Sequence, residues 1–341
     1  MLDRKLISAR YNKIESRLLN DNDKVVYSTL DYHKSIFWGD FCTTIDVTRL
    51  SAFSRIVKIV RSGVKTFKYD KFFVTGGERT DLLALSILSL IPWVTRKFVV
   101  VDAHWQKKSG VVGLLQNTML FFSRRIITQI QVHSDEEKEL YPLLFPIDKN
   151  RIKVIPFSTS IMGYKLNLEN NEFILSGGGS FRNYKPIIEI SNDLPISVKL
   201  GIPESFMRNF SYLESSKNIE IISNWSNSEY FSQMSKCEIF LMPLESGLNR
   251  TAGDQTILNA MFMRKVVVIS NSITARAYIK HGVTGLIYNE GDSSSLLEVI
   301  NYWIGLSSTK KKKILDKAEF EANTKFSEQR RLLKTAIMGI S

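Results

Sequence analysis

The chain has 341 residues, of which 44% are hydrophobic, 23% are charged and only 18 are glycine. This length predicts two domains of ordinary size, and the composition excludes a chain that is collagen-like, solenoidal or disordered throughout. The net charge is +12, and residues 1–160 carry +9 of it, with 25 Lys and Arg against 16 Asp and Glu. A basic first half indicates an anionic partner: a phosphorylated substrate, an anionic lipid or a nucleic acid.

Cysteines and histidines are few and widely spaced. Cys42 and Cys237 form no Cys-x-x-Cys pair, and no two of the four histidines have the spacing of ligands on a helix, so we expect neither a disulfide framework nor a metal site. Residues 1–20 mix charged and apolar side chains, unlike a signal peptide. The longest apolar stretch, 82–94, is shorter than the ~20 residues of a membrane span. These features predict a cytoplasmic protein without a resident cofactor.

Short apolar runs alternate with helical patterns along almost the whole chain. The first half predicts, in order, strand 24–29, helix 51–62, strand 71–75, helix 79–90, strand 97–101, helix 111–125, strand 127–132, helix 135–145 and strand 152–155. The second half predicts strand 172–176, helix 185–191, strand 196–199, helix 204–215, strand 219–222, helix 228–235, strand 239–242, helix 255–263, strand 266–269, helix 274–280, strand 285–288 and helix 293–306. Continuously apolar strands that alternate with helices belong in parallel sheets covered on both faces. We therefore predict two doubly wound α/β domains, with ligand sites at the carboxyl ends of their strands.

The domain junction is predicted where periodic patterns stop. Pro156 ends a strand, and the residues up to 171 are polar and irregular. We predict domains at 1–160 and 161–306, followed by a charged run at 307–313 and a terminal helix to about residue 336. This last segment, 307–341, can cross back to the first domain. One face of the predicted helix repeats every four residues at Ile314, Ala318, Ala322 and Phe326.

The strongest local signal is a glycine-rich run, Phe173-Ile-Leu-Ser-Gly-Gly-Gly-Ser-Phe-Arg-Asn-Tyr-Lys185. Glycines let the backbone approach a ligand closely, and free amides at the start of the next helix favour an anion. Arginine supplies paired donors suited to phosphate oxygens. A tight turn with a solvated arginine explains the pattern equally well, and the run is not a Walker A loop. The candidate anion-binding residues are Gly178, Gly179, Ser180, Arg182 and Lys185.

A second glycine-bearing helix start follows strand 239–242 and a polar loop. Its residues are Gly253, Asp254, Gln255 and Thr256. Ordinary N-capping is the alternative explanation of this segment. Two such helix starts in one domain favour a shared diphosphate ligand.

The segments Arg264–Ser270 and Tyr278–Asp292, with Ala260 and Met261 before them, resemble the donor domain of GT-B glycosyltransferases, particularly glycosyltransferase family 4. Gly282, Gly285 and Asp292 fall at matching places. Segments 130–138 and 151–157 are similar to that family's last strands before the hinge, so the resemblance covers roughly residues 97–304. It implies the GT-B fold, with two doubly wound Rossmann-like domains and a C-terminal helix.

The resemblance also implies a function. It implies transfer of a sugar from a UDP- or GDP-linked donor to a saccharide hydroxyl, by a metal-independent hexosyltransferase in surface polysaccharide or lipid-linked glycan synthesis. Retention of anomeric configuration is implied too, but the family's two glutamates fall at Thr251 and Asn259, which leaves this open. The Asn259 amide can still bind ribose hydroxyls, so it joins the donor-binding candidates. Arg264 and Val266 stand where the family has Gly and Pro. The missing glutamates motivate an alternative: a non-catalytic relative that binds nucleotide-sugar or glycan.

Two strand ends in the first half carry reactive side chains. Strand 97–101 leads into Asp102 and His104, either of which can take a proton from an acceptor hydroxyl. The alternative is a capping Asp and a structural loop His. Gly76, Gly77 and Glu78 follow strand 71–75 and are the acceptor-binding candidates. We interpret His133 as structural, and the Asp-x-Asp match at 21–23 as a polar turn.

Basic residues flank apolar ones in the first half. Lys107, Lys108, Arg124 and Arg125 surround the apolar runs 111–115 and 119–122. A second basic cluster comprises Lys58, Arg61, Lys65, Lys68 and Lys71. This combination predicts peripheral contact with the anionic inner face of a membrane, while an ordinary buried helix with solvated ends is the alternative. Nucleic acid is not an expected partner, because no basic stripe interleaved with aromatics and no reading motif is present.

Overall fold

The computed structural model describes residues 26–30, 42–68, 72–95, 98–161, 172–210, 212 and 218–338. Their contacts divide the chain into two compact units. The N-terminal unit takes the described residues up to Pro156 together with 328–338, and the C-terminal unit takes the described residues between 157 and 327. Each unit contains a six-stranded sheet. Every strand pairing within the two sheets is parallel, as continuously apolar strands require.

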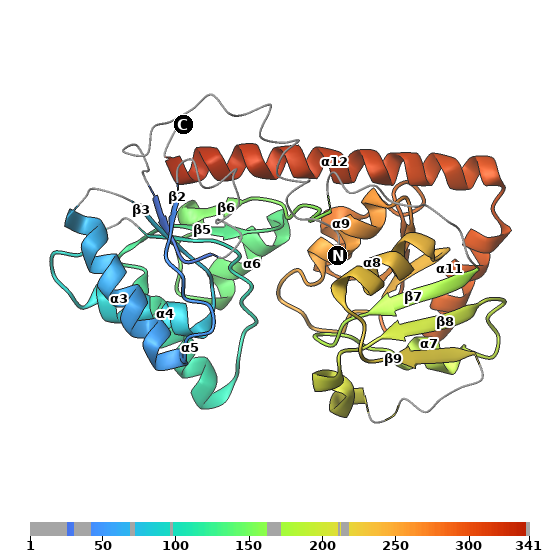
Figure 1. The fold of residues 1–341 in the computed structure, drawn as a ribbon, viewed down its shortest axis with the longest axis horizontal. Helices are drawn as coiled ribbons and strands as arrows, with labels where there is room; N and C mark the ends of the chain where they lie inside the picture. The colour runs from blue at the N-terminus through green and yellow to red at the C-terminus, as the bar shows by residue number, and fades with distance from the viewer. Residues whose placement is uncertain are drawn as a thin grey trace. The chain divides into compact units, whose positions relative to one another are not determined.

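The sheet of the N-terminal unit has the strand order β2-β1-β3-β4-β5-β6. Its strands are β1 (Val26–Ser28), β2 (Cys42–Thr44), β3 (Phe72–Thr75), β4 (Phe98–Val100), β5 (Ile127–Val132) and β6 (Ile152–Val154). The helices are α3 (Ala52–Lys68), α4 (Arg79–Ser89), α5 (Gly110–Ser123) and α6 (Asp135–Leu144), with a 3-10 turn η3 (Lys149–Arg151). Helix α4 contacts both α3 and α5, and the three form a layer beside the sheet (Figure 1).

The sheet of the C-terminal unit has the order β12-β11-β10-β7-β8-β9. Its strands are β7 (Phe173–Gly177), β8 (Ser197–Gly201), β9 (Ile219–Ile222), β10 (Ile239–Met242), β11 (Val266–Ser270) and β12 (Leu286–Tyr288). The helices are α7 (Lys185–Glu189), η4 (Glu204–Phe210), α8 (Asn227–Lys236), α9 (Asp254–Phe262), α10 (Ile273–Tyr278), α11 (Ser293–Gly305) and α12 (Ser308–Met338). Alternate residues of β10 enter two different hydrophobic cores, with Phe240 in one and Leu241 in the other. The sheet is therefore buried on both faces.

Helix α12 supplies core residues to both units. Ala318 and Ala322 are fully buried in the C-terminal unit, where small side chains allow the helix to pack closely. Leu333 joins Val26 and Val74 in the N-terminal unit. The C-terminal segment thus serves as a structural element of each unit.

The structure differs from the sequence-based prediction at one missed strand and two helices. Strand β2 was not predicted, because three residues with two threonines make no recognisable apolar run. Of the predicted helix 204–215, the described residues Glu204–Phe210 form a 3-10 helix, η4, and Phe206 N donates to the Pro203 carbonyl at 2.8 Å. The terminal helix begins earlier than predicted: α12 starts at Ser308, within the charged run 307–313, since lysines are good helix formers.

Candidate functional site

In the C-terminal sheet the order of the strands switches sides between β7 and β10. Strands β8 and β9 lie on one side of β7, and β10, β11 and β12 lie on the other. In doubly wound sheets such a switch point, at the carboxyl ends of the strands, is where ligands bind. The loops after both strands are joined here by backbone hydrogen bonds: Asn183 N donates to the Pro243 carbonyl at 2.8 Å, and Glu245 N donates to the Phe181 carbonyl at 3.0 Å. The predicted glycine-rich run and the polar loop after β10 therefore form one surface.

Arg182 lies at the centre of this surface. Its Nε donates to the Gly177 carbonyl at 3.1 Å and its Nη1 donates to the Ser180 carbonyl at 3.0 Å. The side chain is buried, and burial lowers the pKa of its guanidinium. Arg182 is thus a cation that also holds the loop in shape.

The glycines of both predicted turns lie beside the Arg182 side chain. A Cβ on Gly178 would lie 3.2 Å from Arg182 Nη2, and a Cβ on Gly253 would lie 3.1 Å from the same nitrogen. Both glycines have positive φ angles, 105° and 77°, which other residues rarely adopt. The structure therefore places the turn after β7, the start of α9 and the arginine together.

A pocket of about 490 Å³ adjoins Arg182. The predicted residues Gly179, Ser180 and Lys185 line it, and Lys185 Nζ lies 5.6 Å from the centre of the Tyr212 ring. Sequence reasoning missed the wall formed by η4 and the residues beside it, because a regular helix over 204–215 was expected there. That wall consists of Phe206, Asn209, Phe210 and Tyr212.

The first turn of α9 presents the other donor-binding candidates. Gln255 is exposed and Thr256 is half-buried, whereas Asp254 is buried. Asp254 Oδ2 accepts a hydrogen bond from the Tyr278 hydroxyl at 3.3 Å. Its Oδ1 is also buried, and no described residue bonds to it. Asp254 therefore adds negative charge near the helix start, which an anionic ligand has to tolerate.

Asn259, the ribose-binding candidate, lies deeper in α9. Its Oδ1 accepts from Thr159 Oγ1 at 2.8 Å and from Ser160 N at 2.9 Å, and its Nδ2 donates to Ser160 Oγ at 3.1 Å. In this structure the amide holds the segment that begins the C-terminal unit. Ribose binding by Asn259 requires this segment to share or release the amide.

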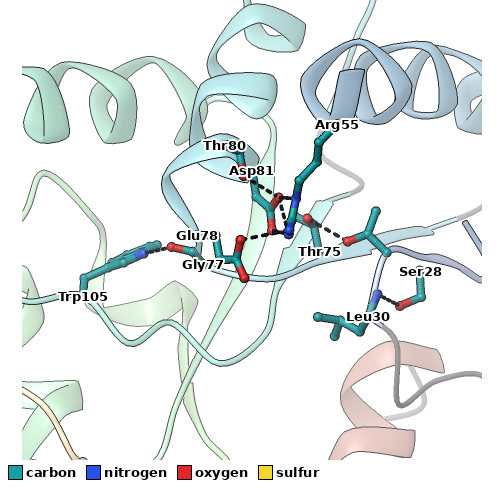
Figure 2. A network of polar contacts seen from close by, with 10 residues as sticks. Ser28, Leu30, Arg55, Thr75, Gly77, Glu78, Thr80, Asp81 and Trp105 are labelled. Atoms are coloured by element: carbon teal, nitrogen blue, oxygen red, sulfur yellow. Dashed lines mark hydrogen bonds and ion pairs between the residues drawn. The ribbon is translucent and has the colours of Figure 1, made fainter. Parts of the chain in front are cut away.

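In the N-terminal unit, the acceptor-binding candidates after β3 belong to a charged network (Figure 2). Arg55 of α3 pairs with the exposed Glu78 at 2.9 Å and donates to both oxygens of Asp81, at 2.9 and 3.1 Å. Asp81 is fully buried, and this burial raises the pKa of its carboxyl to about 6, although Arg55 lowers it. Glu78 is thereby fixed at the carboxyl end of β3.

A hydrogen bond links this strand end to the next one. Trp105 Nε1 donates to the Gly77 carbonyl at 2.9 Å (Figure 2). A Cβ on Gly77 would lie 3.0 Å from that indole nitrogen, so a larger residue would disturb the contact. On the other side, a Cβ on Gly76 would lie 3.2 Å from Asp81 Oδ2. An added methyl group would thus make a tight contact at either glycine.

Asp102 and His104 follow β4 as predicted, and His133 joins them from the end of β5. His133 Nε2 lies 3.4 Å from Asp102 Oδ1, and the rings of His104 and His133 stack with their centres 4.6 Å apart. Asp102 has a φ of 54°, and its side chain is 25% exposed against 4% for His133. Sequence reasoning missed this contact, although His133 ends a parallel strand just as Asp102 does.

Two further observations concern metals and membranes. Among the described residues, no three His, Cys, Asp or Glu side chains cluster as metal ligands would. No helix in the described part of the chain has the length and apolar character needed to cross a bilayer. The Asp-x-Asp match at 21–23 lies outside the described residues.

No protein-family model matches the sequence, and no curated protein matches it. Solved structures do match in fold. A glycosyltransferase from Rickettsia africae ESF-5 is similar with a TM-score of 0.65 and 16% identity, over 98% of this chain and 94% of that one. HepE from Anabaena, in complex with UDP and glucose, is similar with a TM-score of 0.64 and 15% identity, over 86% and 85%. Sucrose-phosphate synthase from Thermosynechococcus elongatus is similar with a TM-score of 0.63 and 13% identity, over 88% and 84%.

Identities this low are informative about the fold, whereas activity has to be argued from the site. These structures cover most of this chain, and most of their own length matches it in return. Two parallel six-stranded sheets, each flanked by helices, confirm the architecture predicted from the sequence. The chain has the GT-B fold, with two doubly wound domains.

Proposed function

We propose that the protein is a glycosyltransferase that moves a sugar from a nucleotide-sugar to a saccharide hydroxyl. The observation that carries the proposal is the meeting of Gly178, Arg182 and Gly253 at the switch point of the C-terminal sheet. Such a surface offers a cation, backbone amides and close approach to a diphosphate. HepE, which is similar in fold, has been solved in complex with UDP and with UDP-glucose. This supports a UDP-linked donor over a GDP-linked one.

Arg182 and the first amides of α9 are proposed to stabilise the leaving diphosphate. A buried guanidinium interacts more strongly with an anion than a solvated one does, because little water screens it. Lys185 faces the same pocket from an exposed position and adds a second positive charge. In this proposal the cations and amides take the part that a divalent metal plays in other nucleotide-sugar enzymes.

The proposed proton acceptor is Asp102, assisted by His104. Asp102 keeps a partly exposed carboxylate while His133 lies against one of its oxygens. Glu78, held by Arg55, is proposed to bind acceptor hydroxyls. The resemblance to family 4 favours retention of anomeric configuration, whereas direct displacement assisted by Asp102 would invert it, so the anomer of the product distinguishes the two routes.

We further propose that the acceptor is a lipid-linked saccharide, in surface polysaccharide or related glycan synthesis, and that the protein works at the inner face of a membrane. The excess positive charge of the first half supports this setting, since anionic lipids attract basic surfaces.

The decisive experiment is a donor screen followed by turnover. Thermal denaturation with UDP, GDP and their sugars should show stabilisation by one nucleotide family. Release of that nucleotide in the presence of saccharide acceptors then measures transfer. A folded protein that binds none of these nucleotides contradicts the proposal.

A second candidate, a non-catalytic binder of nucleotide-sugar, is favoured by one observation. Thr251 and Asn259 are both buried where the resemblance expects glutamates, and Asn259 is engaged by the Thr159–Ser160 segment. Donor binding without turnover on any acceptor would support this candidate.

A further inference from the structure

Two neighbouring helices of the N-terminal unit expose apolar side chains at helical spacing. On α4 and the turn after it, Leu83, Ile87, Leu90 and Trp93 are exposed. On α5 six large apolar residues are exposed, and several recur at intervals of three, four and seven: Val111, Val112, Leu114, Leu115, Phe121 and Phe122. Trp93, Val111 and Leu114 are 69%, 74% and 67% exposed. Scattered exposed leucines are normal, but two adjacent stripes are not.

The buried face of α5 is small. Only Gly113, Leu120 and Ser123 are buried on it, so the helix turns its larger apolar residues outward. The alternative interpretation from the sequence, an ordinary buried helix, is therefore wrong. Helices α4 and α5 contact each other, and Figure 1 shows them side by side in the unit. We call their exposed apolar residues the α4–α5 face.

Positive charges stand at both ends of α5. Lys107 and Lys108 precede the helix and are exposed. At its other end Arg125 donates to the carbonyls of Ser89 and Ile91, which ties the end of α5 to the end of α4. The α4–α5 face is therefore an apolar surface with cationic ends.

A pocket of about 630 Å³ opens where the two helices end. Three arginines line it, together with Phe121, Phe122 and Phe145. Arg151 donates to the Ile127 carbonyl at 3.1 Å and Arg125 to the α4 end, so both are held in place. The one acidic lining residue, Asp148, accepts from Asn150 N at 2.9 Å. The pocket is thus aromatic and carries a net positive charge.

Arg124 is the cation of this pocket that is available to a ligand. Its guanidinium carbon lies 4.0 Å from the centre of the Phe121 ring. No carboxylate of the described residues pairs with it, and its side chain is exposed. A guanidinium stacked on an aromatic ring keeps its N–H edge open for phosphate oxygens.

We propose that the α4–α5 face is a membrane-docking surface and that the Arg124 pocket receives the phosphate of an anionic phospholipid. Apolar stripes that lie in the interface, with basic residues at their ends, are what binding to an anionic bilayer requires. Trp93 fits this setting, since tryptophan favours the boundary between headgroups and acyl chains. The inference deepens the proposed attachment to a membrane and rests on it.

The test is flotation of the full chain with vesicles of phosphatidylcholine alone and with added phosphatidylglycerol. The wild-type protein should float only with the anionic vesicles, and less as salt rises. The double variant Leu114→Gln and Leu115→Gln should lower partitioning at least about tenfold, because two exposed leucines lose their burial in lipid. Phe320→Gln, at a position 71% exposed on α12, is the matched control and should bind like the wild type.

A second pair of variants tests the pocket. Arg124→Gln should reduce the preference for anionic over neutral vesicles. Arg124→Lys should recover only part of it, because lysine keeps the charge but not the guanidinium stacked on Phe121. An Arg124→Gln variant with the wild-type preference would exclude the pocket as the phosphate site. All these side chains are exposed, so circular dichroism should be unchanged, as should affinity for UDP, which the C-terminal unit is proposed to bind.

The outcomes separate the two levels of the proposal. If wild-type protein ignores anionic vesicles at low salt, the membrane attachment itself fails. If it binds them but the leucine variant binds as well as Phe320→Gln does, attachment stands and the α4–α5 face is not the surface. If the leucine variant instead turns a dimer into a monomer in sedimentation and leaves vesicle binding unchanged, the face joins two copies of the chain, and the inference is overturned.

Discussion

At the scale of single residues, Arg182 has both a structural role in the glycine-rich loop and a proposed role in donor binding, and the sequence indicated only the second. Its Nε and Nη1 satisfy carbonyls of the glycine-rich loop, while its charge faces the turn that begins α9. A residue with both tasks affects stability as well as binding when it is changed.

Arg182→Ala should therefore lower both donor affinity and stability. Two hydrogen bonds are lost from a buried loop, each costing about 1–3 kcal/mol when an acceptor is left unsatisfied. Lys185→Ala, at an exposed position on the same pocket, should weaken nucleotide binding without a change in thermal stability. Calorimetric titration with UDP and thermal denaturation measure the two effects. Wild-type affinity in the Arg182 variant would remove this residue from the donor site.

Asp81 gives the protein a defined dependence of stability on pH. Its folded-state pKa of about 6 lies above the ordinary 3.8, because the carboxyl is buried. The folded state then binds more protons than the unfolded state between these values. The stabilising contribution is complete below about pH 4 and is lost as pH rises to about 6, by up to about 3 kcal/mol.

Urea unfolding at several pH values checks this expectation. Asp81→Asn should remove the decline between about pH 4 and pH 6, whereas Asp193→Asn, at an exposed position, should retain it. A wild-type protein whose stability rises over this interval would show that the Arg55 pair outweighs burial.

At the scale of elements, α12 acts as a structural member of the C-terminal unit. Arg264, at the turn before β11, has a φ of 58° and pairs with Asp316 and Glu319 of α12. The resemblance expects glycine at this position, and the two ion pairs help to hold an arginine in a backbone conformation that glycine adopts more readily.

The close packing of α12 predicts that substitutions on its buried face lower the stability of the protein more than substitutions on its exposed face. Ala318→Leu should destabilise the protein by about 1–3 kcal/mol, because added methylenes have no space in a packed core. Phe320→Ala, two residues away and exposed, should change stability by less than about 0.5 kcal/mol. Denaturant unfolding compares the two. Equal effects would mean that α12 is not packed against this core.

At the scale of the whole molecule, the proposed reaction divides its tasks between the two units. Donor binding is assigned to the C-terminal unit, and proton acceptance to Asp102 in the N-terminal unit. Asp102→Asn should therefore lower kcat by about 10²–10⁴-fold, the usual contribution of a general base. Affinity for the nucleotide should stay within about twofold of the wild type.

Steady-state rates and nucleotide titration on the same preparation test this division. His133→Gln serves as the companion variant, since it removes the partner of Asp102 and leaves the carboxylate in place. We expect an intermediate loss of rate and a shifted pH profile. If Asp102→Asn keeps near-normal turnover, Glu78 becomes the next candidate for proton acceptance.

The sequence alone determined the parts of this protein that depend on local patterns. Apolar runs located eleven strands to within two residues at either end, because burial on both faces leaves a continuous signal in a short segment. The sequence also predicted that Gly178 and Arg182 follow the carboxyl end of one strand and that Gly253 follows the carboxyl end of another.

Only the tertiary structure decided which distant groups meet. The Asn259 amide bonds to Thr159, 100 residues away, and His133 reaches Asp102 across two strand ends. Helical periodicity likewise indicated an apolar face on α5. Only the structure shows that this face is left uncovered by the described elements. Strand and helix patterns are set by neighbours in the chain, whereas contacts and exposure are set by how the elements pack, so the latter follow only from the folded structure.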